Sequence, residues 1–160
     1  HFAIRRQRQM CIRDSISIEA SLSSLKKFKG VKRRMDFIIE SSNICIYDDF
    51  AHHPTAIKLS CDAIRKQYPS KKILGIIELG SNTMSSGYHK DNLINAFQEL
   101  DETLLLDSKK KYSYKNVYDS DLDLISHAKE IIFEYDIILI MTNKDSQKFI
   151  QPLVNHLEKK

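Results

Sequence analysis

Short apolar runs that alternate with helix-forming segments constrain the fold of this chain most strongly. The runs cover residues 73–77, 103–106 and 136–141. Apolar runs of this length are typical of parallel strands that are buried on both faces. Amphipathic periodicity predicts helices over residues 56–68, 90–100, 122–133 and 146–157. We therefore expect an α/β fold with a Rossmann-like, mostly parallel sheet and helices on both of its faces.

A β-hairpin is expected ahead of this alternation. Its arms are Phe37–Ile39 and Ile44–Ile46, and residues 41–43 (Ser-Ser-Asn) supply the turn. Ligands of parallel sheets bind beyond the carboxyl ends of the strands. We expect that edge to carry the loops at residues 48–55, 78–88 and 142–146.

The first residues do not resemble the rest of the chain. Arg5 to Ser15 reads RRQRQMCIRDS, lacks the periodicity of a strand or a helix, and is similar to a translated sequencing adapter or assembly scar. We expect residues 1–15 to be a non-native or disordered leader. The folded domain should occupy residues 16–160, with a short helix over residues 21–28.

Composition argues against several classes of protein. The net charge of +4 is too small to indicate nucleic acid, and no apolar run approaches the ~20 residues of a membrane span. Cys11, Cys45 and Cys61 form no CxxC pair, so we expect no metal site and reduced thiols in a cytoplasmic protein. Phosphate-loop, dinucleotide-binding and nucleophile motifs are missing, so no catalytic residue is assigned.

A basic cluster lies ahead of the hairpin, where six of the nine residues from Lys26 to Arg34 are basic. A solvated charge run is the commonest interpretation of such a cluster. The alternative is a phosphate contact, because arginine offers a planar fork of donors that suits phosphate oxygens. Arg34, next to the hairpin, is the candidate for that contact.

An acidic, histidine-rich segment follows the hairpin. Asp48, Asp49, His52 and His53 crowd the junction between the second arm and a helix that Pro54 opens. Two carboxylates beside two imidazoles can bind Mg²⁺ or accept hydrogen bonds from ribose hydroxyls. The alternative makes one aspartate a turn residue and one histidine a helix cap. The residues alone favour neither interpretation.

A loop of small polar residues follows the first central strand. Ser81, Asn82 and Thr83 carry hydrogen-bonding side chains that can contact a polar substrate. An ordinary surface loop is the alternative.

Together, these three segments resemble the C-terminal domain of the Mur ligase family. The resemblance lies in residues 28–35 (FKGVKRRM), 47–57 (YDDFAHHPTAI) and 81–84 (SNTM). It implies ATP-dependent amide formation in peptidoglycan synthesis, and through it a part in cell-wall biogenesis, cell shape, the cell cycle and cell division. It also implies that ATP and Mg²⁺ are bound mainly by a central domain that this sequence lacks. No ligase activity is therefore expected from this chain alone.

The resemblance also implies roles for individual residues. The implied nucleotide-binding residues are Arg34, Asp48, Asp49, His52 and His53. Arg34 would reach the phosphates and Asp48 the ribose hydroxyls, while the histidines would lie near the phosphates or hold the loop in shape. The implied substrate-binding residues are Ser81, Asn82 and Thr83.

The loop at residues 81–84 narrows the choice within the family. It resembles the member that joins recycled L-alanyl-γ-D-glutamyl-meso-diaminopimelate to UDP-N-acetylmuramate, with the remaining domains of the same ligase as partners. The alternatives are the member that adds L-alanine, and a non-catalytic Rossmann-like nucleotide-binding module. This chain departs from the family pattern at Leu79-Gly80, where relatives carry Pro-Arg, and Lys144 is a candidate to restore that charge.

Overall fold

The computed structural model describes residues 17–27, 31–86, 90–109 and 111–159, without the side chains of residues 18, 21, 25, 83, 85, 90 and 91. The chain divides into two units, His1–Val31 and Lys32–Lys160. The first unit contains helix α2 (Ile18–Lys26), which overlaps the helix predicted over residues 21–28. The leader predicted over residues 1–15 lies outside the described residues.

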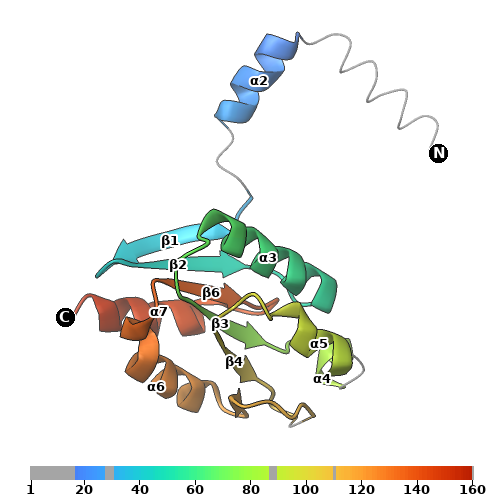
Figure 1. Cartoon of the computed structure of the whole chain (residues 1–160), viewed down its shortest axis with the longest axis vertical. Helices are drawn as coiled ribbons and strands as arrows, with labels where there is room; N and C mark the ends of the chain where they lie inside the picture. Colours follow the sequence, from blue (N-terminus) through green and yellow to red (C-terminus); the bar gives the residue numbers. More distant parts are fainter. Residues whose placement is uncertain (1–16, 28–30, 87–89, 110, 160) are drawn as a thin grey trace. The chain divides into compact units, whose positions relative to one another are not determined.

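The second unit is built on one sheet with the strand order β1-β2-β6-β3-β4-β5 (Figure 1). Its strands are β1 (Asp36–Ser41), β2 (Ile44–Asp49), β3 (Ile73–Glu78), β4 (Glu102–Leu106), β5 (Val117–Tyr118) and β6 (Ile137–Met141). β1 is antiparallel to β2, and the other pairings between described strands are parallel. The predicted mostly parallel sheet with a leading hairpin is confirmed.

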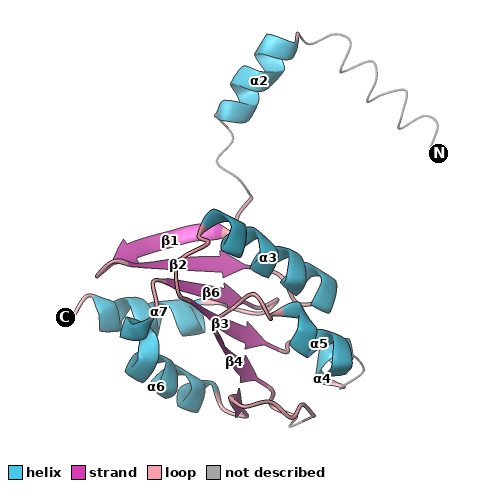
Figure 2. Ribbon diagram, viewed as in Figure 1, coloured by secondary structure: helices cyan, strands magenta, loops and turns pink. Residues whose placement is uncertain are grey.

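Helices cover both faces of this sheet, as expected for buried parallel strands (Figure 2). They are α3 (Pro54–Gln67), α4 (Asn82–Ser85), α5 (Lys90–Ala96), α6 (Asp121–Ile131), the 3₁₀ helix η1 (Ile132–Glu134) and α7 (Gln147–Leu157). Alternate residues of β3 feed two cores. Ile77 packs in one core with Ile57 of α3, and Ile76 packs in the other with Phe149 of α7.

No helix in the described ranges combines the length and the apolar character that crossing a membrane requires.

The hairpin turn is set by two residues with left-handed backbone. Ser42 has φ 53° and Asn43 has φ 63°, between the paired residues Ser41 and Ile44. Positive φ at both central residues is the requirement of a type I′ turn, whose twist matches that of the flanking strands. The predicted turn over residues 41–43 is thereby narrowed to two residues.

The described residues between Asp107 and Tyr118 form more hydrogen bonds than their polar sequence suggests. The buried Asp107 carboxylate accepts backbone N–H bonds from Lys109, Lys111 and Tyr112. The hydroxyl of Tyr112 donates to the carbonyl of Met84 (2.8 Å). These bonds return the chain to the sheet edge as β5, a two-residue strand that the sequence did not predict.

Replacing Asp107 by alanine should destabilise the protein, because several backbone N–H groups then lose a charged acceptor. We expect a loss of about 2–3 kcal/mol in the free energy of unfolding, measured by urea denaturation. Ser113→Ala, at an exposed position in the same loop, should change it by less than about 0.5 kcal/mol. Equal effects of the two substitutions would contradict the role of Asp107.

Candidate functional site

The predicted loops meet at one edge of the sheet. β2, β6 and β3 run parallel, with Asp49 opposite Met141 and Met141 opposite Ile77. The residues that follow these strand ends therefore lie side by side, as the topology of parallel sheets requires. The predicted edge, formed by the loops at residues 48–55, 78–88 and 142–146, is confirmed for its described residues.

A partly buried ion pair, formed by the buried Asp48 and the half-buried Arg33, lies at the centre of this edge. The Asp48 side chain is only 3% exposed, and its Oδ2 accepts hydrogen bonds from Arg33 Nε (3.1 Å) and Ser146 Oγ (2.8 Å). Arg33 Nη2 also donates to the carbonyl of Thr142 (2.7 Å). Asp48 Oδ1 is buried and has no hydrogen-bond partner in the described part of the chain. One carboxylate thus joins three segments and retains one unused acceptor.

The backbone ahead of the hairpin is bent so that Arg33 can reach Asp48. Arg33 and Met35 have φ angles of 57° and 48°, in the left-handed region that side chains other than glycine seldom adopt. Asp49 holds the bend, because its Oδ2 accepts the N–H of Met35 (2.8 Å) while its Oδ1 accepts the N–H of Ala51 (2.7 Å). The Phe50 N–H donates to the carbonyl of Arg33 (2.9 Å).

Above the ion pair, an exposed cation rests on an aromatic ring. The guanidinium carbons of Arg34 and Arg33 lie 5.5 and 5.2 Å from the centre of the Phe50 ring. His52 meets the same ring edge-on, and its Nδ1 is 2.9 Å from the carbonyl oxygen of Phe50. Arg34 and Asp48 therefore lie on the same rim of the sheet, with Arg34 exposed and Asp48 buried beneath it.

The predicted residues at the start of α3 and α4 have local structural roles. His53 is the N-cap residue of α3, its carbonyl accepts the N–H of Ile57, and its side chain makes no capping hydrogen bond. The Ser81 hydroxyl caps α4 by accepting the N–H of Met84 (3.3 Å). Asn82 is exposed, and the side chain of Thr83 lies outside the described residues.

A second buried carboxylate, at the end of β3, was not predicted as a site residue. Glu78 Oε2 accepts the hydroxyl of Thr142 (2.7 Å), and Oε1 lies 2.8 Å from Lys148 Nζ and 3.3 Å from Lys144 Nζ. Burial alone would raise the pKa of Glu78. The hydrogen bonds from Lys148 and Thr142, with the charges of both lysines, instead hold its pKa below the ordinary value of 4.5.

The carboxylates that the sequence offered to Mg²⁺ are directed elsewhere. Asp49 binds backbone N–H groups, and Asp48 is paired with Arg33. In the ranges that the structure describes, no group of three or more His, Cys, Asp or Glu side chains is arranged to hold a metal ion. These residues therefore do not fit a Mg²⁺ site, because Asp48 Oδ2 and both Asp49 oxygens serve the Arg33 pair and backbone N–H groups.

Comparison with known proteins identifies relatives of this chain. Residues 33–143 match the family described as "Mur ligase, glutamate ligase domain". The UDP-N-acetylmuramate–L-alanyl-γ-D-glutamyl-meso-2,6-diaminoheptandioate ligase of Haemophilus influenzae is 39% identical over 92 residues, which are 57% of this chain and 20% of that protein. The UDP-N-acetylmuramate–L-alanine ligase of a Hydrogenobaculum species is 35% identical over 108 residues, 67% of this chain and 24% of that protein.

A solved structure agrees with these matches. The crystal structure of a murein peptide ligase from Psychrobacter arcticus superposes with a TM-score of 0.70 at 31% sequence identity, over 91% of this chain and 34% of that one. The matched part of the chain spans about a fifth to a quarter of the length of the Haemophilus and Hydrogenobaculum proteins.

Removing the Arg33 side chain should leave Asp48 as an incompletely compensated buried charge. We expect Arg33→Ala to lower the free energy of unfolding by about 2–4 kcal/mol, since breaking a buried pair from one side is costly. Lys32→Ala, at the exposed neighbouring position, should cost less than about 0.5 kcal/mol. Urea denaturation of both variants tests this, and an Arg33→Ala value as small as the control would refute the pair's importance.

The low pKa of Glu78 gives its contribution to stability a defined pH dependence. A carboxyl group whose pKa is lower in the folded state stabilises the protein above its ordinary pKa, here 4.5, and loses that contribution as pH falls through the folded value. The stability difference between wild type and Glu78→Gln should thus be largest near pH 7 and shrink below about pH 4.5. Thermal unfolding from pH 7 to pH 3 measures it, and a constant difference would contradict the assignment.

Proposed function

Because the chain belongs to the Mur ligase family, we propose that it is the C-terminal domain of an ATP-dependent ligase that joins L-alanyl-γ-D-glutamyl-meso-diaminopimelate to UDP-N-acetylmuramate. This reaction serves peptidoglycan recycling and, through it, the cell wall and cell division. We propose residues 16–160 as the extent of the domain. The free Cys45 and Cys61 favour a cytoplasmic location.

The observation that carries the proposal is that the exposed Arg34 lies on the same rim of the sheet as the Arg33–Asp48 ion pair. Arg34 is exposed on the Phe50 ring, so its donors can reach the phosphates of a nucleotide held by another domain. Asp48 Oδ1 needs a donor, and a ribose hydroxyl supplies one. Asp49 and His52 keep the loop in the shape that presents these groups, and His53 lies at the start of the following helix.

In the proposed reaction, ATP phosphorylates the carboxylate of UDP-N-acetylmuramate and ADP leaves. The peptide amine then attacks the acyl phosphate at its carbonyl carbon, inorganic phosphate leaves with the bonding electrons, and the amine loses a proton. We propose that this domain acts as a lid that completes the site. Arg34 would stabilise charge on the phosphates, and Ser81, Asn82 and Thr83 would face the peptide. Mg²⁺ neutralises phosphoryl charge when bound, and we assign it to the central domain.

The principal alternative is the ligase that adds L-alanine, because the Hydrogenobaculum relative is nearly as similar to this chain as the Haemophilus protein. The Ser81–Met84 segment favours the tripeptide. A chimera in which residues 32–157 replace the corresponding domain of the Haemophilus ligase tests the choice by mass spectrometry of the product. We expect the tripeptide adduct of UDP-N-acetylmuramate, and an adduct of L-alanine alone would overturn the proposal.

A non-catalytic nucleotide-binding module is the alternative from another class. It would bind ATP tightly by itself, whereas a lid domain that meets the nucleotide on one side should bind it weakly or undetectably. Calorimetric titration of the isolated chain with ATP separates the two. ATP turnover by the purified chain above a matched blank would contradict the lid proposal.

Arg34→Ala in the chimera should impair use of ATP without unfolding the domain. Loss of one charge-assisted hydrogen bond, about 1.5–3 kcal/mol, corresponds to a decrease of about 10- to 100-fold in kcat/KM for ATP. Arg34→Lys should recover part of the loss, and Lys32→Ala should have no effect. Because Arg34 is exposed, the free energy of unfolding of Arg34→Ala in urea should stay close to that of the wild type. Full activity of Arg34→Ala would exclude the phosphate contact.

A further inference from the structure

A cavity of about 220 Å³ opens beside Glu78, where β3 and β4 end and α6 begins. Its wall carries charges of both signs. The charged and polar lining residues that matter are Glu78, Asp119, Ser120, Asp121, Lys144 and Lys148. A cavity that presents ammonium groups and carboxylates together complements a ligand that itself carries both charges.

The two lysines differ in how far they are neutralised. Lys148 Nζ lies 2.8 Å from Glu78 Oε1 and 3.9 Å from Asp121 Oδ2, so it sits between two carboxylates. Lys144 Nζ lies 3.3 Å from the same Glu78 oxygen, and its side chain is 54% exposed. Lys144 can therefore approach a ligand carboxylate while giving up fewer existing contacts than Lys148 would.

The missing side chain at Gly80 makes room for Lys144. A Cβ at Gly80 would lie 3.1 Å from both Cγ and Cε of Lys144 and 2.2 Å from Asn143 Oδ1. Lys144, from the loop after β6, thus lines the cavity in space that a side chain at position 80 would need.

The cavity is also lined by an anionic surface and by the start of a helix. Ser120 is the N-cap residue of α6, which has 11 residues, and its side chain makes no capping hydrogen bond. Asp121 lies in the first turn, and Asp119 precedes it. These carboxylates suit an ammonium group, while Lys144 suits a carboxylate.

We propose that this cavity binds the terminal amino-acid group, with its α-ammonium and α-carboxylate, of the diaminoheptanedioate end of the peptide substrate. The proposal rests on the proposed function and extends it, because it assigns the far end of the peptide to named residues. Lys144 is then a residue that determines specificity. L-Alanine, the shorter substrate of the alternative ligase, cannot reach this cavity while its amine is at the nucleotide rim.

The spacing of the sheet supports the assignment. Adjacent strands lie about 4.8 Å apart, so the ends of β2 and β3, separated by β6, are about 10 Å apart and β4 is about 5 Å further. An extended chain spans at most about 3.3–3.6 Å per residue, so three residues reach about 10–11 Å. The γ-glutamyl link and the diaminoheptanedioate side chain lengthen this peptide beyond that. A tripeptide laid across the strand ends from the Asp48 rim therefore reaches the cavity and passes the Ser81 loop.

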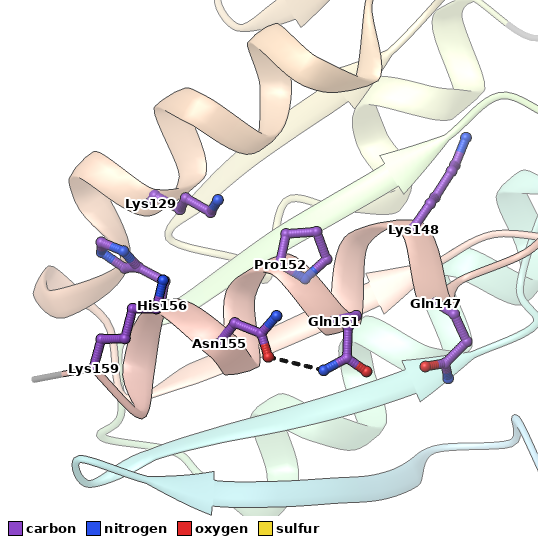
Figure 3. A pocket seen from close by; sticks show the side chains of 8 residues that line it. All are labelled: Lys129, Gln147, Lys148, Gln151, Pro152, Asn155, His156 and Lys159. Atoms are coloured by element: carbon purple, nitrogen blue, oxygen red, sulfur yellow. Dashed lines mark hydrogen bonds between the residues drawn. The ribbon is translucent and has the colours of Figure 1, made fainter.

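A second hollow, a groove along α7, does not suit the same ligand. Figure 3 shows Gln147, Gln151 and Asn155 in a row along the helix, with Lys129, His156 and Lys159 toward one end. Its lining holds cations and amides and no carboxylate. It has no carboxylate to form an ion pair with an ammonium group, and Lys129 therefore supplies a matched control position.

The test is a titration of the ¹⁵N-labelled chain with four small probes, followed by amide chemical shifts. The probes are 2,6-diaminoheptanedioate, heptanedioate without the amines, 1,5-diaminopentane without the carboxylates, and L-alanine. We expect saturable shifts at Leu79, Ser120 and Lys144 with the first probe. The other three probes should bind at least about 10-fold more weakly. Equal affinity for heptanedioate or for the diamine, or no saturable shift with diaminoheptanedioate, would overturn the proposal.

Variants locate the binding. Lys144→Ala, at a half-exposed position, should weaken diaminoheptanedioate binding about 10-fold or more, and Lys129→Ala should leave it unchanged. In the chimera, Lys144→Ala should raise KM for the tripeptide and leave KM for ATP unchanged. If the chimera makes the tripeptide adduct and Lys144→Ala leaves its KM for the tripeptide unaltered, the role of the cavity is refuted and the proposed function stands. A chimera that makes only the L-alanine adduct refutes the proposed function.

Discussion

The buried carboxylate of Asp48 is the contact on which the arrangement of the site depends. Its Oδ2 is shared by Arg33, ahead of the hairpin, and by Ser146, at the start of α7. Arg33 in turn reaches the carbonyl of Thr142 after β6. A charge in this position is costly to bury unless it is paired and hydrogen-bonded. The need to compensate it therefore brings together segments that are more than a hundred residues apart.

The same principle operates two strands away. Glu78 is buried at the end of β3 and draws Thr142, Lys144 and Lys148 toward it. Thr142 links the two carboxylates. Its hydroxyl donates to Glu78, and its carbonyl accepts a hydrogen bond from Arg33, which also donates to Asp48. The edge is thus one connected polar network whose members are satisfied, apart from the Oδ1 atoms of Asp48 and Asn143 among the described residues. Such a network favours a single geometry, which suits a surface that must meet a second domain.

The sequence predicted the sheet well because its apolar runs and helical periodicity are local signals. β5 was missed because its pairing depends on hydrogen bonds to Asp107 rather than on an apolar run. The three predicted loops share an edge, since topology follows from the alternation of strands and helices. Side-chain directions could not be read from sequence. Positive φ at Arg33 sends that side chain inward and leaves Arg34 outside, and the pairing of Glu78 with Lys148 spans 70 residues.

The direct test of this account is the coupling between the two residues of the buried pair. A double-mutant cycle of Arg33→Ala and Asp48→Asn, followed by urea denaturation, isolates their interaction from the effects of each change alone. If Asp48 organises the rim through Arg33, the cycle should give a coupling free energy of about 1–3 kcal/mol. Additivity within about 0.3–0.5 kcal/mol would mean that the pair is incidental and that another contact holds the site together.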